Sequence, residues 1–179
     1  MTLSIRSFSL YLILTYSSAS FAYFIDHLKL QYAGEIGLVS IGMGKQVTPS
    51  YSFDFFYGYV PESMDNNEIE TFAFKNYYDV TSFGAFTKEI NFYGGINLYH
   101  VIGLKYQTSR LASYPRSYYR MASIRALLFL GLNMNHRKNT KFYFESGVND
   151  IWLINYANNA ESLNISDYIS HAFGWTYIF

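Results

Sequence analysis

Few residues in this chain have the type or the spacing that catalysis requires. The chain contains no cysteine, which excludes disulfides, thiolate nucleophiles and cysteine-ligated metals. Its histidines lie far apart, and no two share a strand face at i, i+2 or a helix face at i, i+4, so the sequence predicts neither a metal site nor a cofactor. The histidines are His27, His100, His136 and His171. Ser170 precedes His171, but neighbours on a strand point to opposite faces, so no catalytic residues are assigned.

Four charged residues stand out because each interrupts a run in which apolar side chains alternate. They are Asp54, Lys75, Arg125 and Glu145. Unpaired charges inside a protein are costly, so two acids and two bases that enter one interior are expected to pair. The sequence therefore predicts a polar core built from these side chains. The alternative interpretation is a proton-conducting or gated pore.

The alternation around these charges predicts strands. A helix would scatter the rings of residues 50–60 around its circumference, whereas a strand places them on one side. A strand between lipid and a lumen must alternate in this way. The rings on the predicted outer face belong to Tyr51, Phe53, Phe55, Tyr57 and Tyr59, and the inner face carries Ser52, Asp54, Phe56 and Gly58.

Other segments repeat the pattern with different regularity. Residues 70–78, 122–133 and 141–149 place Lys75, Arg125 and Glu145 on their inner faces. Residues 34–47 and 91–106 are less regular. In the second of these the parity places His100 in lipid, unless a bulge at Gly94-Gly95 or at Gly103 shifts the phase.

The strand count depends on the segment that follows residue 147. A tight turn over residues 147–150 makes residues 151–157 a seventh strand and residues 166–179 the eighth. If residues 141–157 form one long strand, the count is seven. Bacterial single-chain barrels have even strand numbers, so we predict an all-β, antiparallel transmembrane β-barrel of eight strands, with both termini on the periplasmic side. Side chains fill a barrel of this size, which favours the polar core over the pore.

Composition agrees with a barrel. A chain of 179 residues has room for one domain. Its 19 Tyr and 16 Phe are too many rings for a soluble domain of this size to bury, whereas a barrel exposes them to lipid and in interfacial girdles. Acidic and basic residues number 13 each, so there is no basic excess that would indicate a nucleic-acid partner.

Residues 1–22 have the order of a secretory signal peptide. Arg6 lies in a short amino-terminal region, an apolar stretch follows over residues 8–14, and Ser20-Phe21-Ala22 supplies a small-x-small ending. The apolar stretch is far shorter than the ~20 residues that span a bilayer. We predict cleavage after Ala22 and a mature barrel over residues 23–179.

The carboxyl terminus carries a resemblance to a known class. Phe173, Trp175, Tyr177 and Phe179 occupy every second position, and the chain ends on the last of them. This ending resembles the final strand of bacterial outer-membrane proteins, which implies recognition by the barrel assembly machinery. In size and strand count the chain is similar to small OmpA/OmpX-like barrels and, more distantly, to lipid A deacylase-type barrels. The resemblance implies a Gram-negative outer membrane, with membrane lipid and lipopolysaccharide as partners.

Two function classes remain open at this point. The first is a non-enzymatic barrel that serves envelope integrity or surface contact. The second is an acyl hydrolase that acts on lipid A or phospholipid. Known deacylase barrels carry a His-x-Ser-Asn motif on one strand, and no histidine here is followed by x-Ser. The first class is therefore predicted, with a divergent enzyme that uses Glu145, Asp150 and a serine as the alternative.

Residues 107–119 form the longest polar connection that still carries aromatic residues. Arg110 and Arg116, with Arg120 just beyond, lie beside several tyrosines. Arginines in this setting could bind lipopolysaccharide phosphates. Tyr and Arg also anchor barrels at the membrane interface, which is the interpretation that we favour here.

Overall fold

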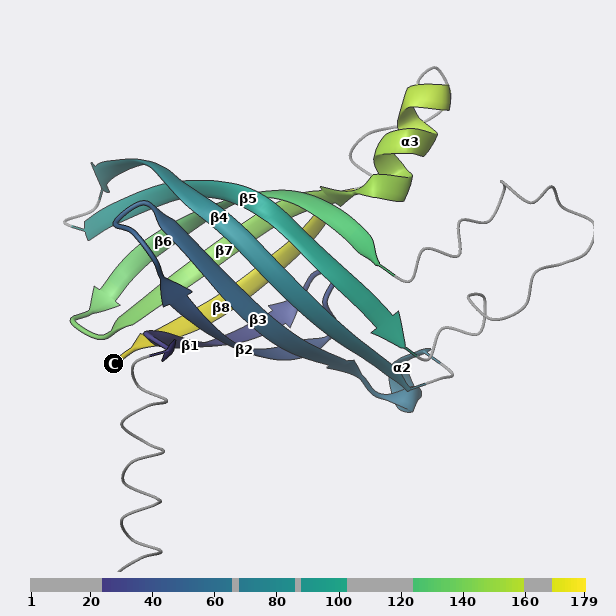
Figure 1. The fold of residues 1–179 in the computed structure, drawn as a ribbon, viewed down its shortest axis with the longest axis horizontal. Coiled ribbons are helices and arrows are strands. Elements are labelled where there is room, and N and C mark those ends of the chain that lie inside the picture. The colour runs from purple at the N-terminus through teal and green to yellow at the C-terminus, as the bar shows by residue number, and fades with distance from the viewer. Residues whose placement is uncertain (1–23, 66–67, 86–87, 103–123, 160–168) are drawn as a thin grey trace, which may run out of the picture.

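The chain folds into one closed antiparallel barrel (Figure 1). The computed structural model describes residues 24–65, 68–85, 88–102, 124–159 and 169–179. Each strand pairs with its neighbours in chain order, and the last strand pairs with the first. The strands are β1 (His27–Ala33), β2 (Val39–Gln46), β3 (Tyr51–Val60), β4 (Ile69–Ala85), β5 (Lys88–Ile102), β6 (Arg125–Arg137), β7 (Thr140–Asn149) and β8 (Ser170–Ile178). The all-β, eight-stranded prediction is confirmed.

Two helices lie in the connections of the described chain. They are α2 (Glu62–Asp65) between β3 and β4, and α3 (Asp150–Asn159) after β7. Neither described helix is long and apolar enough to cross a bilayer.

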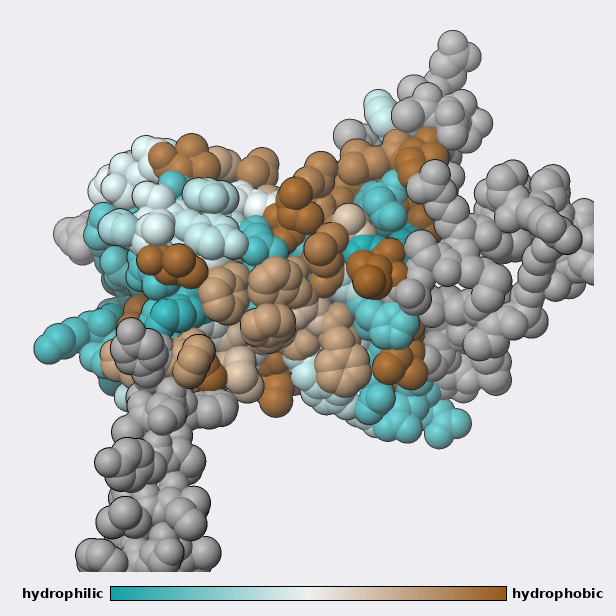
Figure 2. Space-filling view, viewed as in Figure 1, coloured by the Kyte–Doolittle hydropathy of each residue, from teal (hydrophilic) through white to brown (hydrophobic). Residues whose placement is uncertain are grey.

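Period-two alternation separates an apolar outer wall from the lumen. In β3, Ser52, Asp54 and Phe56 are buried, while Phe55 between them is 55% exposed. Figure 2 shows apolar side chains gathered over the middle of the visible wall, with hydrophilic ones mostly toward the two ends. The exposed apolar side chains of the wall include Leu28, Leu30, Ile41, Phe72, Leu98, Leu128, Leu130, Leu132, Phe142, Phe173 and Trp175.

The barrel closes along the pairing of β1 with β8. The register runs from His27 opposite Ile178 to Ala33 opposite Ala172. Beyond the strands, Phe179 N–H donates to the Asp26 carbonyl at 3.1 Å, so the residues that precede β1 and follow β8 are joined at one rim. Closure satisfies the backbone groups that an open edge would leave unpaired.

The count of eight is reached with different strands from those predicted. The short strand β1, His27–Ala33, was not predicted from the sequence. Residues 151–157, predicted to be the seventh strand, lie instead in α3. Their apolar run does not alternate, and Asp150 in the first turn favours a helix start because it faces the positive end of the helix dipole. A tight turn over residues 147–150 is therefore wrong.

The bulge that was considered in β5 lies elsewhere. Pairing of β5 with both neighbours passes through Gly94 and Gly95 without a shift, and the register shift occurs in β4, between Asp79 and Thr81. His100 consequently stays in phase with the exposed Leu98 and Ile102, opposite Phe72. Gly103, residues 107–119 and the predicted signal peptide fall outside the described residues.

Inward-facing glycines make room for inward-facing rings. A Cβ added at Gly131 would overlap the Tyr93 ring, and one at Gly174 would overlap the Tyr143 ring. The two tyrosines are fully or almost fully buried. Small residues opposite large ones thus allow an eight-stranded barrel to be packed through its centre.

Candidate functional site

A cluster of buried polar side chains occupies the lumen, and we call it the lumenal cluster. Asp54 lies at its first centre, with Oδ1 at 2.6 Å from His27 Nε2 and Oδ2 at 2.6 Å from Lys29 Nζ. Lys29 also donates to the Tyr77 hydroxyl at 3.1 Å. These groups come from β1, β3 and β4, so they join strands that are not all neighbours in the sheet. The members of the cluster are His27, Lys29, Gln31, Asp54, Lys75, Tyr77, Tyr93, Tyr143 and Glu145.

The second centre of the lumenal cluster is the ion pair of Lys75 with Glu145. Tyr93 donates its hydroxyl to the other oxygen of Glu145 at 2.9 Å. Gln31 Oε1 accepts from Lys75 at 2.8 Å and from the Tyr143 hydroxyl at 3.2 Å. Each buried charge of the two centres thus has an opposite charge and further polar partners, which is what burial of charge requires.

The structure brings three of the four predicted core charges into the lumen. Asp54, Lys75 and Glu145 are 0%, 1% and 4% exposed. Arg125 is on the inner face but at the first residue of β6, where its Nε donates to Asp150 Oδ1 at 3.0 Å and no cluster member is its ion-pair partner. The second buried base is Lys29, which the sequence analysis missed together with β1. Lys29 alternates with the exposed Leu28 and Leu30, and this pattern is the signal that could have revealed it.

The loop between β1 and β2 turns inward at one end of the lumen. Ala33 and Gly34 have φ of 62° and 85°, and Gly37 has φ of 150°, so the chain reverses tightly. Ile36 at the tip is 1% exposed and joins the apolar core with Phe56 and Tyr99. The lumen is consequently filled by side chains at this level as well as at the lumenal cluster.

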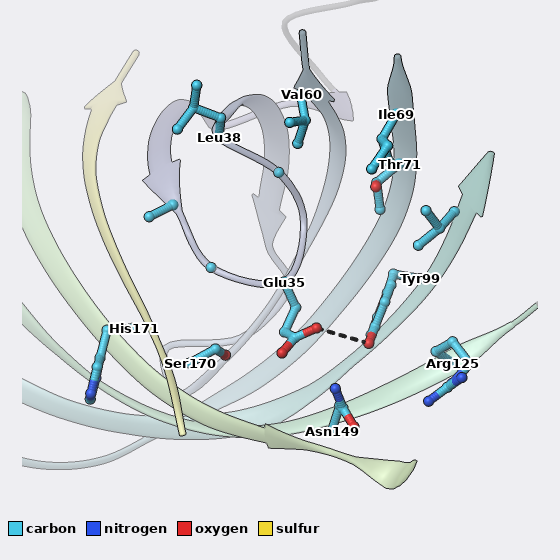
Figure 3. Close-up of a pocket in the computed structure, with 14 residues that line it drawn as sticks. Glu35, Leu38, Val60, Ile69, Thr71, Tyr99, Arg125, Asn149, Ser170 and His171 are labelled. Atoms are coloured by element: carbon cyan, nitrogen blue, oxygen red, sulfur yellow. Dashed lines mark hydrogen bonds between the residues drawn. The ribbon is translucent and has the colours of Figure 1, made fainter. Parts of the chain in front are cut away.

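A cavity remains beyond this loop, and we call it the mouth cavity. It measures about 600 Å³ and is lined by residues of the β1–β2 loop and of seven strands, β2 excepted (Figure 3). Leu38, Val60 and Ile69 lie toward one side of it, while Glu35 and Tyr99 meet toward the other. The Tyr99 hydroxyl donates to Glu35 Oε2 at 3.3 Å.

A serine and a histidine meet on the outer face of the wall. Ser146 of β7 and His171 of β8 are opposite each other in the register, and Ser146 Oγ lies 2.8 Å from His171 Nδ1. Phe144 stacks on the His171 ring with centroids 5.6 Å apart and planes at 17°. Ser146 and His171 share the face of Phe144 and Phe173, which points away from the lumen.

This pair was not found from the sequence. The serine considered beside His171 was Ser170, whose hydroxyl donates to the Gly147 carbonyl at 3.3 Å. Glu145, named with Asp150 as a possible enzyme acid, belongs to the lumenal cluster on the opposite side of the wall. Within the described chain, no group of three or more His, Asp and Glu side chains could hold a metal ion.

These features define a class. The chain is a small, closed, antiparallel β-barrel with an apolar outer wall and a filled lumen, which is the architecture of the small outer-membrane barrels.

Comparison with known proteins assigns the chain to no family. No family model and no curated protein matches the chain. Among solved structures the chain is similar to the outer membrane enzyme PagL, with a TM-score of 0.47 and 12% identity over 86% of this chain and 99% of that one. A likeness this distant transfers no residue role.

Proposed function

We propose that the chain is an integral barrel of the Gram-negative outer membrane that hydrolyses acyl ester bonds of lipids in the outer leaflet. The observation that carries this proposal is the hydrogen bond between Ser146 and His171 on the lipid-facing side of the wall. A serine next to an imidazole base is the minimal arrangement for an activated oxygen nucleophile.

The position of the pair supports the outer leaflet. At the end of the barrel where β1 begins and β8 ends, the strands are joined by short connections of residues 47–50, 86–87 and 138–139. At the opposite end, the longer connections of residues 61–68, 103–124 and 150–169 join the strands. Outer-membrane barrels have short periplasmic turns and longer extracellular loops. Ser146 and His171 lie close to the long-loop end, since β7 ends at Asn149 and β8 begins at Ser170. Water and ester groups of a lipid meet at this level.

The chemistry follows from the contact. With the ring in its Nε2–H tautomer, Nδ1 accepts the serine proton while Oγ attacks the carbonyl carbon of the ester. The protonated ring returns its proton to the departing alcohol, and water then releases the fatty acid from the serine by the same proton transfers. The stacked Phe144 limits rotation of the ring, which keeps Nδ1 directed at Ser146.

The pair differs from the deacylase motif named above. When the motif His-x-Ser-Asn is aligned on Ser146, Phe144 stands at the histidine position and Gly147 at the asparagine position. The histidine that contacts Ser146 comes instead from the neighbouring strand β8. The proposed site is therefore built across strands.

A non-enzymatic envelope barrel is the second candidate. One observation favours it: within the described residues, no carboxylate hydrogen-bonds the His171 ring to complete a Ser-His-acid set. In that case the hydrogen bond between Ser146 and His171 only satisfies the two polar side chains on an apolar surface.

Purified barrel in vesicles of lipid A and phospholipid distinguishes the two. Release of fatty acid, followed by mass spectrometry, should fall about a hundredfold or more in Ser146→Ala and in His171→Gln. Ser170→Ala is the matched control, because it removes a hydroxyl at the same rim from a residue outside the pair. Product masses identify which lipid is cleaved. No release by the folded wild type, or equal release by Ser146→Ala, would leave the non-enzymatic barrel.

A further inference from the structure

The mouth cavity has the size and the two-sided lining of a small-molecule site. Its volume of about 600 Å³ falls in the usual range for ligand pockets. The lumenal cluster and the buried Ile36 fill the lumen elsewhere, so the mouth cavity is a blind pocket rather than part of a channel. His171 also belongs to the lining of the mouth cavity, but its side chain and that of Ser146 share the outward phase of Phe144 and Phe173, so their hydrogen bond lies on the outer face of the wall.

One side of the mouth cavity is apolar. Leu38, Val60, Ile69 and Val101 line it from the β1–β2 loop and from β3, β4 and β5. Apolar walls of this kind contribute affinity for the apolar body of a ligand without fixing its orientation.

The other side carries a fixed carboxylate. Glu35 projects from the β1–β2 loop toward Tyr99 (Figure 3). The loop is held by hydrogen bonds from Ala33 N–H to the Leu38 carbonyl at 2.9 Å and from Leu38 N–H to the Tyr59 carbonyl at 3.1 Å. The carboxylate is therefore positioned before any ligand arrives, which reduces the entropy cost of binding.

The charges at the mouth cavity are not balanced. Arg125, the cation of the described lining, has its Nε on Asp150. Glu35 has a neutral partner, the Tyr99 hydroxyl, and within the described chain it takes part in no ion pair. Glu35 and Arg125 are the acid and the base of the described lining, and the ion pair with Asp150, which lies outside the lining, offsets the charge of Arg125. The Glu35 carboxylate is therefore the charge in this lining that no described ion pair offsets, which favours a cation. The Tyr99 hydroxyl, next to Glu35, is a second polar group that an ammonium donor can contact.

We propose that the mouth cavity binds a small amphiphilic cation, an amine attached to a compact apolar body. The ammonium group lies against the Glu35 carboxylate beside the Tyr99 hydroxyl, and the apolar body lies against Leu38, Val60, Ile69 and Val101. This proposal does not depend on the hydrolase activity proposed above.

The test uses three probes of one shape and different charge on the full barrel in lipid nanodiscs. 1-Adamantanamine is the cation, 1-adamantanol the neutral control and 1-adamantanecarboxylate the anion. Titration calorimetry should show the amine binding about tenfold tighter than the alcohol, the strength of one charge-assisted contact, and should show the carboxylate as the weakest of the three.

Two variants locate the binding. Glu35→Gln should abolish the preference for the amine, while Glu62→Gln, which removes an exposed acid in α2 outside the lining, should leave it unchanged. Ile69→Trp should weaken all three probes because it fills the apolar side. Heat-modifiable gel mobility verifies that each variant is folded. Partition of a given probe into the nanodisc lipid is the same for the wild type and for every variant, so differences between variants report binding to the protein. Equal binding of the three probes, or an unchanged preference for the amine in Glu35→Gln, would overturn the proposal.

Discussion

Lys29 and Asp54 form an ion pair of 2.6 Å inside the lumen that links β1 to β3 over the intervening β2, two strands that are not neighbours in the sheet. The pair therefore fixes β1 from the inside of the barrel, in addition to the backbone pairing with β2 and β8. Because β1 completes the closure, we expect loss of this pair to affect the whole barrel.

The first prediction concerns Lys29. Lys29→Met should lower the free energy of unfolding by about 3 to 5 kcal/mol, because it leaves Asp54 buried without its lysine. The double variant Lys29→Met/Asp54→Asn should recover part of this loss, since it removes the buried carboxylate that has lost its lysine and retains only His27. Urea unfolding in detergent, followed by tryptophan fluorescence, measures both.

Lys45→Met is the matched control. Lys45 is paired with Asp26 at 3.4 Å, and both side chains are about one-third exposed. A solvent-exposed pair contributes about 0 to 1 kcal/mol. Equal unfolding midpoints for Lys29→Met and Lys45→Met would mean that the lumen is hydrated rather than filled.

The second prediction compares the contributions to stability of Lys75 and Arg125, which the sequence placed in one polar core. Lys75→Met should destabilise the barrel by about 3 to 5 kcal/mol, because Glu145 is almost fully buried. Arg125→Met should cost about 1 kcal/mol or less, because Asp150 is 36% exposed at the rim. The same urea titration measures both variants, and a larger effect of Arg125→Met would contradict the rim position.

The sequence predicted which face each of these charges would occupy, but not its depth. Alternation places Lys75 and Arg125 on inner faces, because a strand has a period of two. Depth depends on the register between strands and on the strand ends, and a single sequence contains no record of either. Arg125 begins β6 and therefore lies at the mouth, whereas Lys75 lies in the middle of β4.

The third prediction concerns the inward loop. A Cβ added at Gly58 would overlap the carbonyl oxygen of Ile36, so Gly58→Ala should displace the loop of residues 34–38 and cost about 1 to 3 kcal/mol. A protease that cleaves after glutamate should then cut at Glu35 faster than in the wild type, as mass spectrometry of the fragments would show. Gly84→Ala is the control, because nothing lies within 4 Å of its added Cβ. Unchanged cleavage in Gly58→Ala would mean that the loop does not depend on this contact.

The proposed hydrolytic pair could not be derived from the sequence for a related reason. Ser146 and His171 are 25 positions apart, and only the pairing of β7 with β8 places them opposite each other. That pairing requires that the intervening residues do not contribute a strand. A strand at residues 151–157, as predicted from the sequence, would have separated Ser146 from His171, whereas these residues lie in α3.

The last prediction concerns the end of β8. Phe173, Trp175, Tyr177 and Phe179 are all exposed on the outer wall, and Phe179 also donates its N–H to Asp26. Deletion of Phe179 removes one ring and one hydrogen bond at the rim, so the loss is at most about 1.5 to 3 kcal/mol from the ring and about 1 kcal/mol from the bond. The purified truncated chain should therefore still fold in detergent, as heat-modifiable gel mobility would show.

In cells we expect the truncated chain to accumulate in the periplasm or to be degraded, because the ending that resembles an assembly signal is lost. Phe173→Ala is the control, since it removes a ring from the same face and keeps the final residue. Membrane fractionation compares the two, and normal assembly of the truncated chain would show that its ending is not read as a signal.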